Sequence, residues 1–202
     1  YDIQNPKHET QHALLKTDLS LFAGEHLIKV KYGLQRNIRK EFDVRRGELN
    51  NRPVIDLKLL SHTFEVAWTQ ATKDSWSGNS GIQLFAQNSF NARGSNPINF
   101  VPDYDVLNFG AYTIQQLKID ESVLELGIRV DHQKLSVVDT IREVTFYDNK
   151  IKFTNVTFTL GYRKKISDAV SLFTNVGTAW RPPNVSELYS FGYHFSRIQF
   201  GL

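Results

Sequence analysis

The chain has 202 residues, a formal net charge of +3 and 12% aromatic residues, which is the range of one or two globular domains. It contains no cysteine, so a disulfide scaffold, a zinc ribbon and a thiol enzyme are excluded. The small charge argues against a nucleic-acid partner, and no stretch approaches the run of about 18 apolar residues that a transmembrane helix needs.

Alternation of apolar and polar residues, the pattern of a β-strand, recurs from one end of the chain to the other, and helical periodicity is nearly absent. In chain order the alternating segments are 15–21, 28–34, 64–68, 82–86, 107–111, 123–133, 156–162 and 172–180. The sequence therefore predicts an all-β chain with about eight antiparallel strands.

The segment 123–133 shows the alternation most clearly. Successive side chains of a strand point to opposite faces. One face would carry the apolar residues Leu124, Leu126, Ile128 and Val130, and the other would carry the polar residues Glu125, Arg129, Asp131 and Gln133. One side of the predicted sheet is therefore apolar, and the other is ionic.

Short polar turns alternate with long connections between these segments. The short turns lie near 24–25, 73–77, 120–122 and 167–168, and the long connections are 43–53, 91–103, 136–150 and everything after Arg181. Short turns at one end and long loops at the other are typical of outer-membrane barrels. The sequence thus favours an antiparallel up-and-down sheet that is part of a transmembrane β-barrel.

A soluble sandwich or a lipocalin-like barrel shows the same alternation, with the apolar face turned inward. Two features favour the membrane interpretation. Charged residues occur at strand centres, and aromatic residues lie towards strand ends, as in the girdles of outer-membrane barrels. These aromatic residues are Tyr32, Trp68, Tyr162 and Trp180.

Four segments resemble a known family. Residues 179–190, Ala-Trp-Arg-Pro-Pro-Asn-Val-Ser-Glu-Leu-Tyr-Ser, closely resemble a strand-to-loop segment of TonB-dependent outer-membrane receptors, although Pro182 stands where that family usually has Ala. Residues 127–131, Gly-Ile-Arg-Val-Asp, resemble the Gly-x-Arg-x-Asp strand of these receptors. Residues 35–43 are similar to another strand-to-loop transition, and 108–112 to a common strand opening.

The resemblance implies the wall of a receptor in the outer membrane of a Gram-negative bacterium. Such a receptor takes up a scarce nutrient, such as a ferric siderophore or a similar chelate. Its partners would be this transported ligand, outer-membrane lipid, and the inner-membrane TonB complex, which acts through a plug. The resemblance places Arg181, Glu187 and Tyr189 at the top of a strand and the start of an extracellular loop. With Tyr193 and His194, they are the candidate ligand-binding residues.

We expect residues 1–202 to be a fragment of the barrel, because the chain begins at Tyr1, contains no methionine and shows no signal peptide. Neither a plug domain nor a TonB box is recognisable in it. Barrels of this family have about 22 strands around a plugged lumen, so eight strands would form roughly a third of the wall.

The sequence predicts neither a metal site nor a catalytic site. His8 and His12 have a spacing that would place both on one face of a helix, but the same spacing has no such meaning on a strand, and no third ligand lies nearby. No nucleophile elbow or phosphate loop occurs. We therefore expect no metal, no cofactor and no enzymatic activity.

Two alternative functions remain open at this point. The first is a soluble β-rich module that binds carbohydrate or a protein, which would differ from a barrel wall in needing no detergent. The second is an outer-membrane enzyme barrel such as a lipase or a protease. It would need an acid, a base and a nucleophile on one face, and the sequence does not place them.

Overall fold

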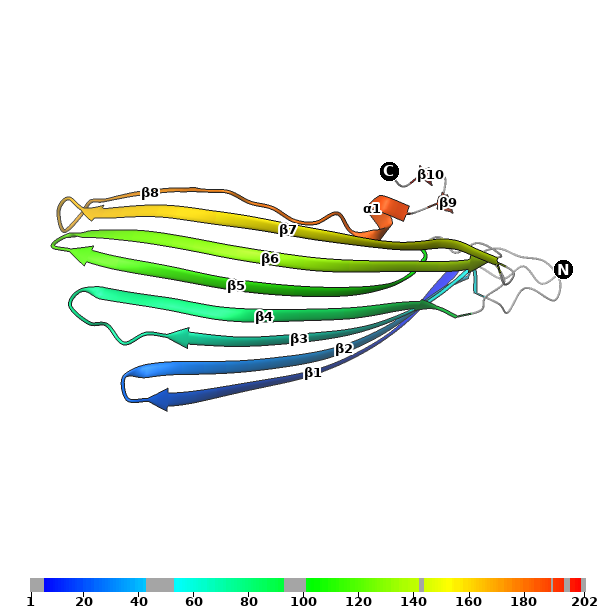
Figure 1. Cartoon of the computed structure of the whole chain (residues 1–202), viewed down its shortest axis with the longest axis horizontal. Helices are drawn as coiled ribbons and strands as arrows, with labels where there is room; N and C mark the ends of the chain where they lie inside the picture. The colour runs from blue at the N-terminus through cyan, green and yellow to red at the C-terminus, as the bar shows by residue number, and fades with distance from the viewer. Residues whose placement is uncertain are drawn as a thin grey trace.

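A computed structural model describes residues 6–42, 53–92, 101–141, 144–189, 191–194 and 197–200. Eight antiparallel strands form one sheet in which each strand pairs with its sequence neighbours, from β1 to β8 (Figure 1). They are β1 (Lys7–Ala23), β2 (His26–Phe42), β3 (Ile55–Thr69), β4 (Trp76–Asn91), β5 (Asp103–Ile119), β6 (Ser122–Ile141), β7 (Val144–Lys165) and β8 (Ser171–Gly177). The predicted all-β up-and-down architecture is confirmed.

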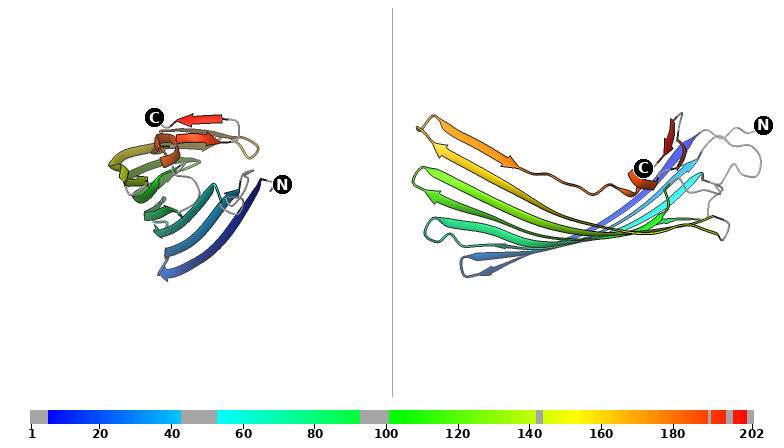
Figure 2. Two further views of the ribbon diagram at one scale, coloured as in Figure 1. Left: turned by 90° about the vertical axis from the view of Figure 1, so that its right-hand side faces the viewer. Right: turned by 45° about the horizontal axis from the view of Figure 1, so that its top comes forward.

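A short helix, α1 (Val185–Tyr189), and a two-stranded sheet of β9 (Phe191–His194) and β10 (Arg197–Phe200) follow the large sheet. The large sheet is curved, and α1 lies over its hollow side (Figure 2). No helix among the described residues has the length and apolar character needed to cross a bilayer.

Tight turns join the strands at one end of the sheet, as the sequence predicts. Gly24 makes the β1–β2 turn with a φ of 62°. Asp74 and Ser75 make the β3–β4 turn, and Asp120 makes the β5–β6 turn, all with positive φ. Asp is among the residues that tolerate this left-handed conformation because its short polar side chain can hydrogen-bond locally. This end is called the turn end, and the opposite end is the loop end.

The two faces of the sheet can be told apart by α1. The helix packs through Val185 on Leu135 and Val137, two odd-numbered residues of β6, so these residues face the hollow side. Odd-numbered residues of β6 thus form the inner face, and even-numbered residues form the outer face. The pairing register then assigns every other strand residue to one face or the other.

The outer face is apolar and uncovered. Leu126 is 55% exposed, Ile128 49% and Phe158 55%, although all three lie on strands inside the sheet. In register with them, β2 to β5 present Ile28, Val30, Leu34, Phe64, Val66, Trp68, Ile82, Leu84 and Phe109 on the same face. This set forms a continuous belt without a charged side chain, which we call the apolar belt.

One predicted loop is wrong. The connection expected at 136–150 is instead a continuation of β6 to Ile141 and of β7 from Val144, with a register shift after Asp139. The alternation reverses its phase here, because Leu135 and Val137 are buried on the inner face under α1 while Lys134 and Val138 point outward. A search for one constant apolar face therefore misses this part of the strand.

The last predicted strand also ends earlier than expected. β8 stops at Gly177, and the amide of Thr178 still donates to the carbonyl of Phe158 at 2.9 Å. Beyond it, Pro182 and Pro183 have no N–H to donate, so the chain leaves the wall. Trp180 contacts Phe153 on the inner face, with ring centroids 6.5 Å apart. The prediction that Trp180 belongs to an aromatic girdle is therefore wrong.

Candidate functional site

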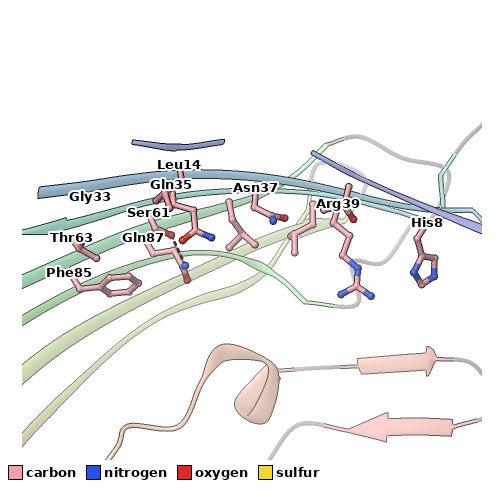
Figure 3. A pocket seen from close by; sticks show the side chains of 13 residues that line it. His8, Leu14, Gly33, Gln35, Asn37, Arg39, Ser61, Thr63, Phe85 and Gln87 are labelled. Atoms are coloured by element: carbon pink, nitrogen blue, oxygen red, sulfur yellow. Dashed lines mark hydrogen bonds between the residues drawn. The ribbon is translucent and has the colours of Figure 1, made fainter. Parts of the chain in front are cut away.

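The inner face carries a hollow of about 600 Å³ near the loop end of β1 to β4 (Figure 3). Its floor consists of alternate residues that the register places side by side. They are Gly33, Gln35, Asn37 and Arg39 on β2, Leu57, Leu59, Ser61 and Thr63 on β3, and Phe85 and Gln87 on β4, with His8, Thr10 and Leu14 from β1. We call this set the inner hollow. Every one of these side chains lies on the face opposite the apolar belt.

Amides and hydroxyls dominate the middle of the inner hollow. Gln87 donates to Ser61 Oγ at 2.8 Å and accepts from the hydroxyl of Tyr104 at 2.9 Å, so its amide is held in place. Gln35 and Asn37 lie beside it, and neither forms a side-chain hydrogen bond with another described residue. They are therefore available to donate to and accept from a ligand.

The loop end of the inner hollow is ionic. Glu41 is 2% exposed and pairs with the guanidinium of Arg39, and His8 Nε2 lies 3.9 Å from its carboxylate. A buried carboxylate needs such partners, because burial of an unpaired charge is costly. The side chain of Arg39 remains 47% exposed. It can present its other donors to an anionic group.

Further towards the turn end, the inner face carries ion pairs that are already satisfied. Arg129 makes two hydrogen bonds of 2.6 Å to the carboxylate of Asp131 and one of 2.8 Å to Gln83. Gly110 lies opposite Asp131, where a Cβ would collide with the Arg129 guanidinium. Glycine at this position thus makes room for the pair. Lys31 and Glu65 form a second pair at 3.6 Å.

The segment between β8 and α1 is held by one bidentate contact. Arg181 donates to both carboxylate oxygens of Glu187, at 2.8 and 2.6 Å. Glu187 also accepts from the amide of Asn184, whose own side chain accepts from the amide of Glu187. This reciprocal arrangement is a capping box, so the ion pair fixes the start of α1.

The ion pair between Arg181 and Glu187 makes the stability of α1 depend on pH. The hydrogen bonds from Arg181, followed by the one from Asn184, lower the pKa of Glu187 to about 2. Because this pKa is lowered, the stabilisation is present above the ordinary value of 4.5 and is lost as pH falls through about 2. We expect amide-exchange protection of α1 to be unchanged from pH 7 to pH 5 and to be reduced by Glu187→Gln throughout. A wild-type loss of protection between pH 7 and pH 5 would contradict this assignment.

The structure describes the side chains of three of the five residues that the sequence proposed as a ligand site, namely Arg181, Glu187 and Tyr189. Arg181 and Glu187 bind each other, and Tyr189 packs at the edge of the cluster around Leu135. Tyr193 and His194 belong to β9, and their side chains lie outside the described part of the structure. Contact between any of these five residues and a ligand stays a prediction.

Sequence reasoning did not find the inner hollow. Its floor residues come from four different strands, and Gln35 meets Ser61 only because β2 and β3 pair. The sequence did contain a signal for it, because the polar residues Gln35, Asn37 and Arg39 occupy every second position of β2 and so share one face. His8 and His12 share the inner face of β1, and no group of three metal-ligating residues occurs among the described residues.

A sheet with a polar inner face and an apolar outer face is typical of outer-membrane barrels. A family model described as "TonB dependent receptor-like, beta-barrel" matches residues 11–199. The chain belongs to the TonB-dependent receptors. This family consists of receptors and transporters of the Gram-negative outer membrane. A search of curated protein sequences finds no match.

Two solved structures share the fold of this TonB-dependent receptor chain. The ferric yersiniabactin uptake receptor FyuA from Yersinia pestis matches with a TM-score of 0.66 and 11% identity over 86% of this chain. The copper transporter OprC matches with a TM-score of 0.59 and 13% identity over 92% of this chain. The aligned regions span 28% and 32% of those two proteins. At such identities the likeness concerns the fold alone.

Proposed function

We propose that this chain is part of the wall of an outer-membrane receptor for TonB-dependent uptake of a scarce nutrient. The observation that carries the proposal is the back-to-back arrangement of the two faces. The outer face has no charged residue across its apolar belt, while the inner face holds Arg129, Asp131, Lys31 and Glu65 at the same levels of the strands. Lipid on one side and a polar lumen on the other suit such a sheet.

The exposed belt also argues against a soluble binding module. Soluble monomers rarely expose contiguous apolar patches larger than a few hundred Å². Here exposed apolar side chains lie on seven of the eight strands of the sheet, from Leu19 on β1 to Val176 on β8. Exposure of this apolar surface to water would be unfavourable, whereas a bilayer would cover it.

We propose the inner hollow as a ligand contact, and an anionic chelate such as a ferric siderophore as the ligand class. Free amides at Gln35 and Asn37, together with the partly exposed guanidinium of Arg39, offer donors that suit carboxylate, hydroxamate or phenolate oxygens. Tyr189, Tyr193 and His194 remain proposed contacts at the mouth. A plug and the inner-membrane TonB complex are the proposed partners that move the ligand inward.

The test is ligand binding by the full-length receptor with a Gln35→Leu/Asn37→Leu double substitution. Each lost hydrogen bond costs about 1 kcal/mol, so affinity should fall by about 10- to 30-fold. Binding is measured with iron supplied as a hydroxamate, a catecholate and a citrate chelate, and with copper(II). Arg36→Leu is the matched control, because Arg36 lies between the two residues but points outward. Equal affinity of the double variant and the control would refute the hollow as a contact.

A further inference from the structure

A group of polar and small residues interrupts the apolar outer face between β4 and β5. The group consists of Gly78 and Ser80 on β4 and of Thr113 and Gln115 on β5. We call these four residues the polar patch. They lie on the outer face, because Ser80 pairs with Thr113, and Thr113 pairs with Ile128 of the apolar belt.

Apolar residues lie on both sides of the polar patch along the strands. On β5, the outward residues Leu117 and Ile119 lie on its turn side, and Ala111 and Phe109 lie on its loop side. On the neighbouring β6, every outward residue in the range 124–130 is apolar. The polar patch therefore lies inside the apolar surface and not at either of its ends.

The side chains of the polar patch are hydrogen-bonded to one another. Trp76 Nε1 donates to Gln115 Oε1 at 2.8 Å, and Gln115 Nε2 donates to Thr113 Oγ1 at 2.8 Å. The hydroxyl oxygens of Thr113 and Ser80 lie 2.7 Å apart. A Cβ at Gly78 would collide with the amide of Gln115, so glycine makes room for this side chain. Gln115 therefore lies along the wall instead of projecting from it.

This network leaves hydrogen-bonding capacity unused. Gln115 has two amide hydrogens and donates one of them to a described side chain. One hydroxyl of Ser80 and Thr113 donates to the other, so the second hydroxyl hydrogen has no acceptor among the described side chains. The oxygen atoms of Gln115 and Ser80 keep lone pairs that can accept. Lipid tails offer no partner for these groups, and an unpaired polar group in an apolar medium costs free energy.

We propose that the polar patch is the contact through which two copies of the receptor associate side by side in the membrane. The proposal rests on the proposed function only in taking the apolar belt as the lipid-covered surface. The polar patch is self-complementary, because it carries unused donors together with acceptors and has no charge. A copy related by two-fold symmetry can therefore satisfy it without repulsion between like charges. Gly78, Ser80 and Thr113 are small, and small residues let membrane-embedded walls approach closely.

The first test measures association of the full-length receptor in phosphatidylcholine bilayers. The readout is energy transfer between two labelled copies as the protein-to-lipid ratio is varied. A hydrogen bond between membrane-embedded polar side chains contributes about threefold to association, and two-fold symmetry repeats every contact. Thr113→Val/Gln115→Leu should therefore weaken association at least about tenfold. Folding should be retained, because both changes make the lipid-facing surface more apolar.

Thr69→Val/Gln116→Leu is the matched control, because it removes the same two kinds of side chain from the inner face. There Thr69 accepts a hydrogen bond from Asn79, and Gln116 donates one to Glu125. Association of this variant should stay within about twofold of wild type. Equal association of the two double variants would overturn the proposal. So would a wild-type receptor that stays monomeric at every protein-to-lipid ratio.

The second test is oxidative cross-linking of Ser80→Cys in a receptor without other cysteines. A residue at the centre of a two-fold contact meets its own copy, so a covalent dimer of twice the receptor mass should form. Val156→Cys, which lies outward on β7 and away from the polar patch, should form none. Cross-linking of Ser80→Cys to a different protein, or no cross-link at all, would overturn the proposal. Either result leaves the proposed function intact, whereas a belt that tolerates arginine at Ile128 would remove the proposed function.

Discussion

Ile128→Arg in the full-length receptor should largely prevent assembly of the folded barrel. Ile128 lies within the apolar belt on β6, in register with Thr113 and Phe158, and is 49% exposed on the outer face. An arginine facing lipid near the bilayer midplane costs about 2–4 kcal/mol, which shifts the folding equilibrium by about 30- to 700-fold. The folded fraction is measured as heat-modifiable migration after folding into vesicles of phosphatidylcholine.

Glu125→Arg is the control for this change. It places the same side chain on the same strand, but on the inner face, where Glu125 makes only a hydrogen bond of 2.7 Å with Gln116. We expect nearly wild-type folding of this variant. Gln133, the inner-face position that alternation also suggests, is buried and would add a steric effect. If the two arginine variants fold equally well, the belt does not face lipid.

Val137→Asp should detach α1 from the wall of the folded receptor. Val137 is fully buried under Val185 of α1, together with Leu135. Burying an unpaired carboxylate costs several kcal/mol, more than loss of the few apolar contacts that hold a five-residue helix. Because detachment exposes the carboxylate to water, we expect deuterium uptake in residues 178–189 to rise at least about tenfold at unchanged barrel stability.

Val138→Asp serves as the matched control, since Val138 is the next residue on β6 and is 46% exposed on the opposite face. Uptake in residues 178–189 should differ from wild type by less than about twofold. Unchanged protection in Val137→Asp would show that the capping contact between Arg181 and Glu187 holds the segment without help from the cluster. Loss of the whole barrel in both variants would point to β6 itself rather than to α1.

The position of α1 bears on the proposed uptake. The helix and the irregular segment before it lie over the inner face, so they occupy space that a ligand would otherwise share (Figure 2). Arg181 and Glu187 then act as positioning residues that keep Tyr189 against the wall beside Leu135. We expect their role in uptake to be indirect, through the place of this segment.

The sequence by itself determined the local features of this protein. Period-two alternation identified eight strands, because side chains of a strand alternate between faces whatever the sheet packs against. Gly24 and Asp120 marked turns, since positive φ has a steric cost that few residues avoid. The apolar phase of 123–133 correctly identified which residues of this part of β6 share one face. All of these signals depend on neighbours only a few residues apart.

Only the tertiary structure decided which face is hollow and what covers it. Alternation is symmetrical between the two faces, so it gives no direction of curvature. The reversal of phase at Leu135 exists because α1, about 50 residues later, packs there. Likewise, Gln35 and Ser61 meet only because β2 and β3 pair. These arrangements depend on contacts that no short window of sequence contains.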